Sequence, residues 1–160
     1  MKMKFDDLQQ IVKYLPKESA FVLRCKYIEK FIDTSKDHYD KYIRTVKKFS
    51  DGICYEGYLW DCIINPTVIG FDEVIACREK LNKILIFWDI NSKDRIFIKD
   101  YWKFGKDSML RLDFGDFLDN IEFFPEDVYI FDESLEWSLV LTHEYDSCGI
   151  NRICAKMGDI

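Results

Sequence analysis

Apolar residues recur every three or four positions through the first part of the chain, a spacing that predicts amphipathic helices. The first helix is expected to begin near Phe5. Pro16 is expected to end it, because proline lacks the N–H group that the next turn of a helix needs. A second helix is predicted from Glu18 to Ile32. Its inward face is expected to carry Phe21, Cys25, Ile28 and Ile32.

A third apolar row, from Tyr39 to Phe49, predicts another helix, which follows a turn at Asp33 to Ser35. Two lysines close to its end would interact favourably with the helix dipole. Residues 1–50 are therefore predicted to form a helical subregion. Residues 51–160 are predicted to form an α/β subregion of the same single globular domain.

The hydrophobic period changes after residue 50. Gly57 to Ile64 is expected to be a strand or a short buried segment, and the Asn-Pro dipeptide that follows predicts a turn. Phe71 to Lys83 has the apolar spacing of a helix. Two strands are predicted from Ile84 to Ile90 and from Arg95 to Lys99, joined as a hairpin.

The stretch from Leu112 to Asp146 combines large apolar side chains with carboxylates. Between Asp107 and Asp146 there are twelve acidic residues and one basic residue. At about 100° per residue, a helix at its start would place Phe114, Phe117, Leu118 and Ile121 on one face. The opposite face would carry Asp113, Asp116, Asp119 and Glu122. Because like charges three positions apart repel each other, this face is expected to bind a partner rather than to stabilise the helix.

Three further strands are predicted after Pro125, because their segments are rich in β-branched and aromatic residues. They span Val128 to Asp132, Ser138 to Thr142 and Asn151 to Lys156, and the third is expected to close the sheet. The predicted fold class is α+β, with a helical N-terminal part followed by a mostly antiparallel sheet and one or two further helices.

Charge and hydropathy restrict the partners. The formal net charge is −6, which disfavours direct nucleic-acid binding and acidic membrane surfaces and favours a basic protein. No signal segment is apparent at the start. The longest apolar run, Ile84 to Trp88, is far shorter than the roughly 20 residues that span a bilayer. A soluble, cytoplasmic protein is therefore expected.

No motif indicates a catalytic or metal site. The six cysteines include no Cys-x-x-Cys pair and are expected to be reduced and mostly buried. P-loop, Gly-x-Ser-x-Gly and His-Glu-x-x-His motifs are absent. His143 and Glu144 are neighbours, but adjacent side chains on a strand point to opposite faces and cannot converge without a bulge. We therefore expect no enzyme, no cofactor and no metal, and a structural or interface role for His143.

A protein-binding surface fits this composition better. Complementary charge accelerates association with a basic partner, and aromatic side chains supply anchors. The residues expected to bind the partner are Asp113, Asp116, Asp119, Glu122, Glu126, Asp127, Glu133, Glu136, Trp137, His143 and Glu144.

The run FPEDVYIFDESLEWSLVLTHEYD, followed by NRICAK, resembles the C-terminal part of bacterial immunity proteins that accompany polymorphic toxins of the contact-dependent growth inhibition type. The resemblance covers the chain from about Asp113 onward. It implies a cytoplasmic protein that binds and blocks a cognate toxin domain, for example a nuclease.

Two alternatives to the immunity function stay open. One is a small-molecule- or metal-binding domain, or an enzyme, that uses His143 and nearby carboxylates. The other is a regulatory protein-interaction module unrelated to toxins.

Overall fold

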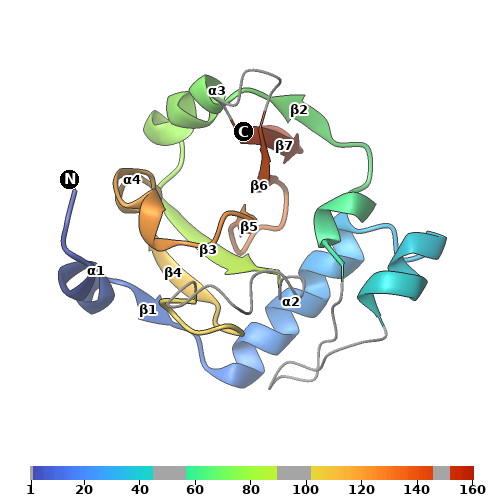
Figure 1. The fold of residues 1–160 in the computed structure, drawn as a ribbon, viewed down its shortest axis with the longest axis horizontal. Helices are drawn as coiled ribbons and strands as arrows, with labels where there is room; N and C mark the ends of the chain where they lie inside the picture. Colours follow the sequence, from blue (N-terminus) through green and yellow to red (C-terminus); the bar gives the residue numbers. More distant parts are fainter. Residues whose placement is uncertain (1, 45–56, 90–101, 146–151) are drawn as a thin grey trace.

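The computed structural model describes residues 2–44, 57–89, 102–145 and 152–160. Within these ranges the chain forms one seven-stranded antiparallel sheet in the order β1-β4-β3-β5-β6-β7-β2 (Figure 1). The strands are β1 Lys13–Tyr14, β2 Thr67–Ile69, β3 Lys83–Trp88, β4 Leu110–Asp113, β5 Val128–Phe131, β6 Ser138–Tyr145 and β7 Arg152–Met157. The predicted α+β class is confirmed.

Helices cover both faces of the sheet. The α-helices are α1 Phe5–Ile11, α2 Lys17–Phe31, α3 Phe71–Ala76 and α4 Phe114–Asp119. Shorter helical turns are the π-turn η1 Tyr39–Ile43 and the 3-10 turns η2 Leu59–Cys62, η3 Cys77–Glu79 and η4 Ile121–Phe123. Figure 1 shows α2 on one side of the sheet and α3 and α4 on the other.

The central strands are buried on both faces, so alternate side chains pack into two hydrophobic clusters, one on each face of the sheet. Ile84 and Ile86 of β3 pack in the cluster that contains residues of α1, α3 and α4. Leu85 and Phe87, which alternate with them, pack in the cluster that contains the inward residues of α2. This explains why β3 is a continuous apolar run rather than an alternating one.

Helix α2 has nearly the predicted extent, and Ile28 and Ile32 of the predicted inward face are buried, but Phe21 is not. Phe21 is 39% exposed, whereas Tyr27 and Phe31 are buried against the sheet. The hydroxyl of Tyr27 lies 2.5 Å from the Oγ of Ser138 on β6. The buried row includes Arg24, a charged residue that hides the apolar periodicity of this face in the sequence.

The first predicted helix forms but ends earlier than expected, at Ile11. Residues 13 and 14 pair with β4 instead, and the N–H of Leu15 donates to the carbonyl of Met109 at 3.0 Å. The predicted helical subregion therefore contributes an edge strand to the sheet. A strand gains its hydrogen bonds from a remote partner, which a local pattern does not reveal.

Several other boundaries differ from the prediction. The helix expected over Phe71 to Lys83 stops at Ala76 and continues as η3, and the preceding strand β2 was not predicted. Gly57 to Ile64 contains the 3-10 turn η2. Of the third predicted helix, the described part is the π-turn η1 and residue Arg44, and the remainder lies outside the described residues.

The second half of the chain follows the prediction more closely. Strands β3, β5, β6 and β7 form where strands were expected, although β2 rather than β7 is the last strand of the sheet. The acidic helix is shorter than expected, because α4 ends at Asp119 and η4 follows. The hairpin strand at Arg95 to Lys99 lies outside the described residues. Among the helices that are described, none has the length and apolar character needed to cross a membrane.

Candidate functional site

The side chain of His143, on β6, is held by Asp127, which immediately precedes β5. Nδ1 of His143 lies 2.9 Å from Oδ1 and 3.2 Å from Oδ2 of Asp127, and the backbone N–H of His143 donates to the same Oδ1 at 2.9 Å. Asp127 is only 1% exposed. Because an ionised carboxylate can only accept, Nδ1 is the protonated nitrogen in this arrangement. No described residue hydrogen-bonds to Nε2.

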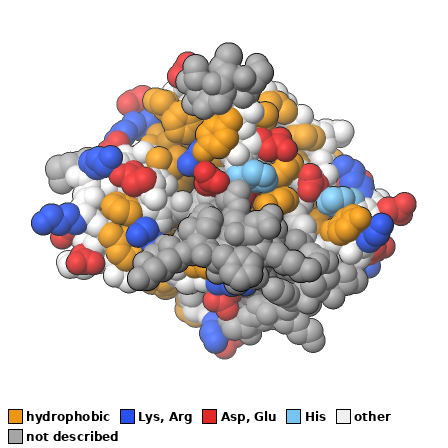
Figure 2. All heavy atoms as spheres, viewed as in Figure 1, with side chains coloured by type: hydrophobic (Ala, Val, Ile, Leu, Met, Phe, Trp, Pro, Cys, Tyr) orange, Lys and Arg blue, Asp and Glu red, His pale blue; other side chains and the backbone are white. Residues whose placement is uncertain are grey.

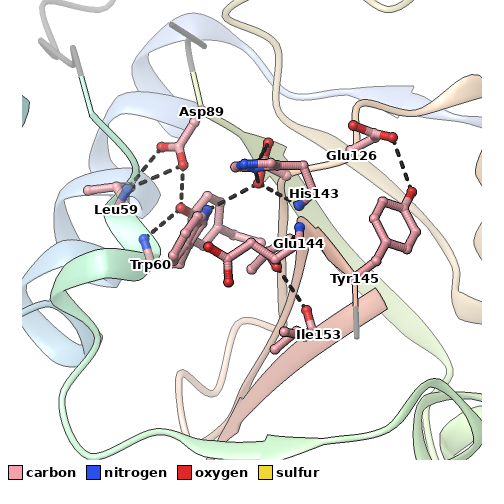
Figure 3. Close-up of polar contacts among 11 residues, drawn as sticks. Leu59, Trp60, Asp89, Glu126, His143, Glu144, Tyr145 and Ile153 are labelled. Carbon is pink, nitrogen blue, oxygen red and sulfur yellow. Dashed lines mark hydrogen bonds and ion pairs between the residues drawn. The ribbon is translucent and has the colours of Figure 1, made fainter. Parts of the chain in front are cut away.

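A second buried acid anchors the turn η2 beside this histidine (Figure 3). Asp89 follows β3, is 1% exposed, and accepts from the Tyr129 hydroxyl and from the N–H of Leu59 at 3.2 Å. The Tyr129 hydroxyl in turn accepts from the N–H of Trp60 at 2.8 Å. The backbone of η2 is thus fixed to the sheet by two buried side chains.

Trp60 joins the two acids. Its backbone N–H belongs to the Asp89 network, and its indole Nε1–H donates to Oδ1 of Asp127 at 3.1 Å. Each buried carboxylate therefore receives several hydrogen bonds, as buried polar groups require. The result is a rigid link between the 3-10 turn and the ends of β5 and β6.

The acid–base properties of Asp89 follow from its surroundings. Burial raises the pKa of Asp89 well above its usual range, and hydrogen bonds from Tyr129 and Leu59 oppose this only in part. Burial likewise raises the pKa of Tyr129, and the neighbouring Asp89 adds to the effect. Both groups are therefore disfavoured in their charged forms.

Substituting Asp89→Asn is expected to change the pH dependence of stability. A carboxyl whose folded pKa lies above its unfolded value of about 3.9 stabilises the fold below that value and loses this contribution as pH rises. The native chain should therefore lose stability, relative to Asp89→Asn, as the pH rises above about 4. Urea unfolding of both proteins at several pH values measures the difference. Parallel stability curves would show that Asp89 is not a titrating group of the fold.

Three aromatic rings form a platform at this position. The rings of Tyr58 and Trp60 stack with centroids 5.1 Å apart and an interplanar angle of 24°. The imidazole of His143 lies 4.9 Å from the Tyr58 ring and 5.9 Å from the Trp60 ring. All three side chains are partly exposed. Aromatic groups that are rigid yet reach the surface are typical anchors of protein interfaces.

Acidic side chains surround the aromatic platform. Asp61 is exposed on η2, where its carboxylate lies 3.1 Å from Nε2 of His38. Glu144 is exposed, and Glu126 accepts from the Tyr145 hydroxyl at 3.2 Å. Figure 2 shows both histidines of the chain on one face, with acidic and hydrophobic side chains around and between them. We call Tyr58, Trp60, Asp61, His143 and Glu144 the aromatic–acidic surface.

The sheet is irregular where His143 and Glu144 lie. The pairing of β6 with β7 shifts register between Leu141 and Tyr145. Even so, the imidazole of His143 hydrogen-bonds to Asp127 and contacts the aromatic rings, and among the described residues it forms no hydrogen bond or ion pair with the Glu144 carboxylate. In the folded chain the partner of His143 is therefore Asp127 and not the adjacent Glu144.

The predicted acidic face of α4 is engaged within the chain. Asp119 forms a two-point ion pair with Arg78, with both N–O distances 2.6 Å. Asp113 pairs with Lys83 at 2.6 Å, and Glu122 pairs with Lys2 at 2.9 Å. Arg78 lowers the pKa of Asp119 through these hydrogen bonds. Within the described part of the chain, Asp116 is the one residue of the four without an ion pair.

The remaining predicted partner residues lie at the other end of β5 and β6. Glu133 forms an ion pair with Arg111, and Glu136 is exposed in the loop between the strands. Trp137 is 6% exposed, and its Nε1–H donates to Asp132 at 2.9 Å. Of the eleven predicted residues, the structure therefore brings together Glu126, Asp127, His143 and Glu144, and it separates them from the others.

Sequence reasoning missed Tyr58, Trp60 and Asp89. Two signals pointed to them: aromatic residues two positions apart in GYLWD, and an aspartate that ends the apolar run ILIFW. Neither signal shows that residues 58–60 meet residue 143, because that contact depends on how η2 is placed against the sheet.

The described residues include no group of three or more side chains suited to a metal ion. Comparison of the chain with protein-family models, curated proteins and solved structures finds no match.

Proposed function

We propose that this protein is an immunity protein that binds a basic toxin domain and blocks it through the aromatic–acidic surface. The observation that carries the proposal is the platform of Tyr58, Trp60 and His143, which is anchored from below by buried hydrogen bonds and bordered by exposed carboxylates. The proposal is also supported by the resemblance of the C-terminal part of the chain to such proteins.

Rigidity favours tight binding. Ordering flexible side chains on association costs about 0.5–1.5 kcal/mol each, and a surface that is already ordered avoids this cost. Trp60 is held through both its backbone N–H and its indole N–H, and His143 through its backbone N–H and Nδ1. The two side chains would therefore present fixed shapes to a partner.

The charge of the surface favours a cationic partner. Glu144 and Asp61 border the aromatic rings, and a lysine or arginine of the toxin domain would meet both a carboxylate and a ring face. The acids of α4 support this role less well, because Lys83, Arg78 and Lys2 already neutralise three of them. We therefore place the docking surface at β6 and η2.

Reversing one charge tests the location. Glu144→Lys is expected to slow association with the toxin domain about tenfold at low salt, because electrostatic steering depends on the local field. Asp116→Lys is the matched control, since it makes the same charge change on α4 and breaks no ion pair given by the structure. The proposal predicts that a neighbouring gene encodes a secreted protein with a variable C-terminal domain. That domain is the ligand, and stopped-flow fluorescence at two salt concentrations gives the rates. A larger effect of Asp116→Lys would locate the docking surface on α4.

Catalysis by His143 is a second candidate, and one observation favours it. Asp127 holds Nδ1 and leaves Nε2 toward the partly exposed side, the arrangement of an oriented general base. No nucleophile is found beside Nε2 among the described residues. A His143→Gln variant that still protects cells from the toxin domain would exclude an essential catalytic role, whereas loss of protection with unchanged binding would favour one.

A further inference from the structure

A groove runs between the N-terminal half of α2 and the strands β1 and β4. It encloses about 610 Å³, and its lining includes Lys13, Tyr14, Val22, Arg111 and Glu133. A second hollow of about 410 Å³ adjoins it, since Arg111 and Glu133 line both. Hollows of this size are typical of small-molecule sites.

Two cations lie side by side on the floor of this groove. Lys13 of β1 and Arg111 of β4 are direct cross-strand partners, so their side chains leave the same face of the sheet. Like charges in this position repel each other. Within the described part of the chain Lys13 has no ion pair, and Arg111 pairs with the carboxylate of Glu133. The floor therefore carries more positive charge than its own counter-ion balances.

The Glu133 carboxylate marks where an anion can sit. It reaches Arg111 from the loop between β5 and β6, and its side chain is 66% exposed. An exposed ion pair contributes little net stability, so an anion from solution can take its place. Displacing Glu133 would also open the boundary between the two hollows, because this pair lines both of them.

The wall of the groove is apolar. Val22 is 47% exposed, and Leu15, Pro16 and Leu23 line the same space. The ring of Tyr14 lies on the opposite face of the sheet, beside Phe104. Glu18 is a further lining residue, and its negative charge disfavours a ligand with a second anionic group. The groove thus combines an apolar wall with two cations and two carboxylates, and an anion fits where it replaces the Glu133 carboxylate on Arg111.

We propose that this groove binds a small amphipathic monoanion, with a carboxylate-like head on Arg111 and Lys13 and an apolar body against Leu15 and Val22. The site is separate from the aromatic–acidic surface. Asp127 precedes β5 and Glu133 follows it, so the two sites lie at opposite ends of that strand. Its test does not depend on any toxin domain.

Octanoate is the probe, and isothermal titration calorimetry of the full chain measures its binding. Octylammonium, which has the same chain length and the opposite charge, is the matched probe. Arg111→Gln is expected to weaken octanoate binding about tenfold, because a charge-assisted pair is lost. Glu133→Gln is expected to strengthen it several-fold, because the internal competitor is removed. Arg78→Gln, which removes a cation that pairs with Asp119 elsewhere, is expected to leave it unchanged.

Opposite effects of Arg111→Gln and Glu133→Gln would establish the site, because general loss of structure would weaken binding in both variants. If Arg111→Gln does not fold, Lys13→Gln replaces it, since Lys13 is exposed at the sheet edge. The proposal is overturned if octylammonium binds as tightly as octanoate. It is also overturned if Glu133→Gln brings no gain, or if octanoate shows no saturable binding.

Discussion

Replacing Trp60 with alanine is expected to weaken the complex with the toxin domain by about 30-fold or more, equivalent to about 2 kcal/mol. The indole is the largest ring of the aromatic–acidic surface, and it stacks on Tyr58 with centroids 5.1 Å apart. Its removal also deletes the hydrogen bond that the indole N–H donates to Asp127 at 3.1 Å. Calorimetric titration with the purified toxin domain measures the loss.

Two further variants separate contact from positioning. Trp60→Phe keeps an aromatic ring but removes the donor to Asp127, so an intermediate loss is expected. Tyr14→Ala removes another partly exposed aromatic side chain at the far edge of the sheet and is expected to leave binding unchanged. An equal loss in Tyr14→Ala would show that the effect is not specific to this surface. The variants of Trp60 are expected to remain folded, because the backbone N–H at this position can still donate to Tyr129. Urea unfolding of each variant checks this.

Replacing Phe31 with alanine is expected to cost about 3–5 kcal/mol of unfolding free energy, whereas Phe21→Ala should cost less than about 1 kcal/mol. Both residues lie on α2, but Phe31 is 1% exposed and Phe21 is 39% exposed. The ring of Phe31 packs against Tyr27 at 4.9 Å, within the cluster that covers the sheet. Its removal leaves a cavity that the surrounding rings fill only in part.

Thermal and urea unfolding of the two variants measure this difference. For a chain of this size, about 4 kcal/mol corresponds to a decrease in Tm of roughly 8–16 °C. A whole domain is stable by only about 5–15 kcal/mol, so Phe31→Ala should approach the limit of folding. If Phe21→Ala were the more destabilising variant, α2 would be packed with the opposite face inward.

The same helix shows what a local pattern can and cannot predict. The extent of α2 follows from the spacing of its apolar residues and from Pro16 at its start. Its inward face does not, because the buried row contains Arg24 and a tyrosine that hydrogen-bonds to Ser138, 111 positions away. The polar groups find partners only in the folded chain, so their burial is not visible in a periodicity.

The acidic stretch shows the same limit for charge. Twelve acidic residues in one segment predict an acidic surface, and many of them do lie at the surface. However, Arg78, Lys83 and Lys2 come from distant positions and neutralise most of the α4 face. The fold decides which carboxylates pair with cations of the same chain, and only the remaining carboxylates are available to a partner.

The sequence by itself determined the α+β class, the central strands β3, β5, β6 and β7, and the acidic, aromatic character of the chain. These follow from composition and from periods of two or about 3.6 residues, which are local properties. The tertiary structure alone decided that His143 meets Asp127 rather than Glu144, and that Trp60 lies between two buried aspartates. Such contacts join residues 16 to 69 positions apart only after the sheet has formed, and no local period records them.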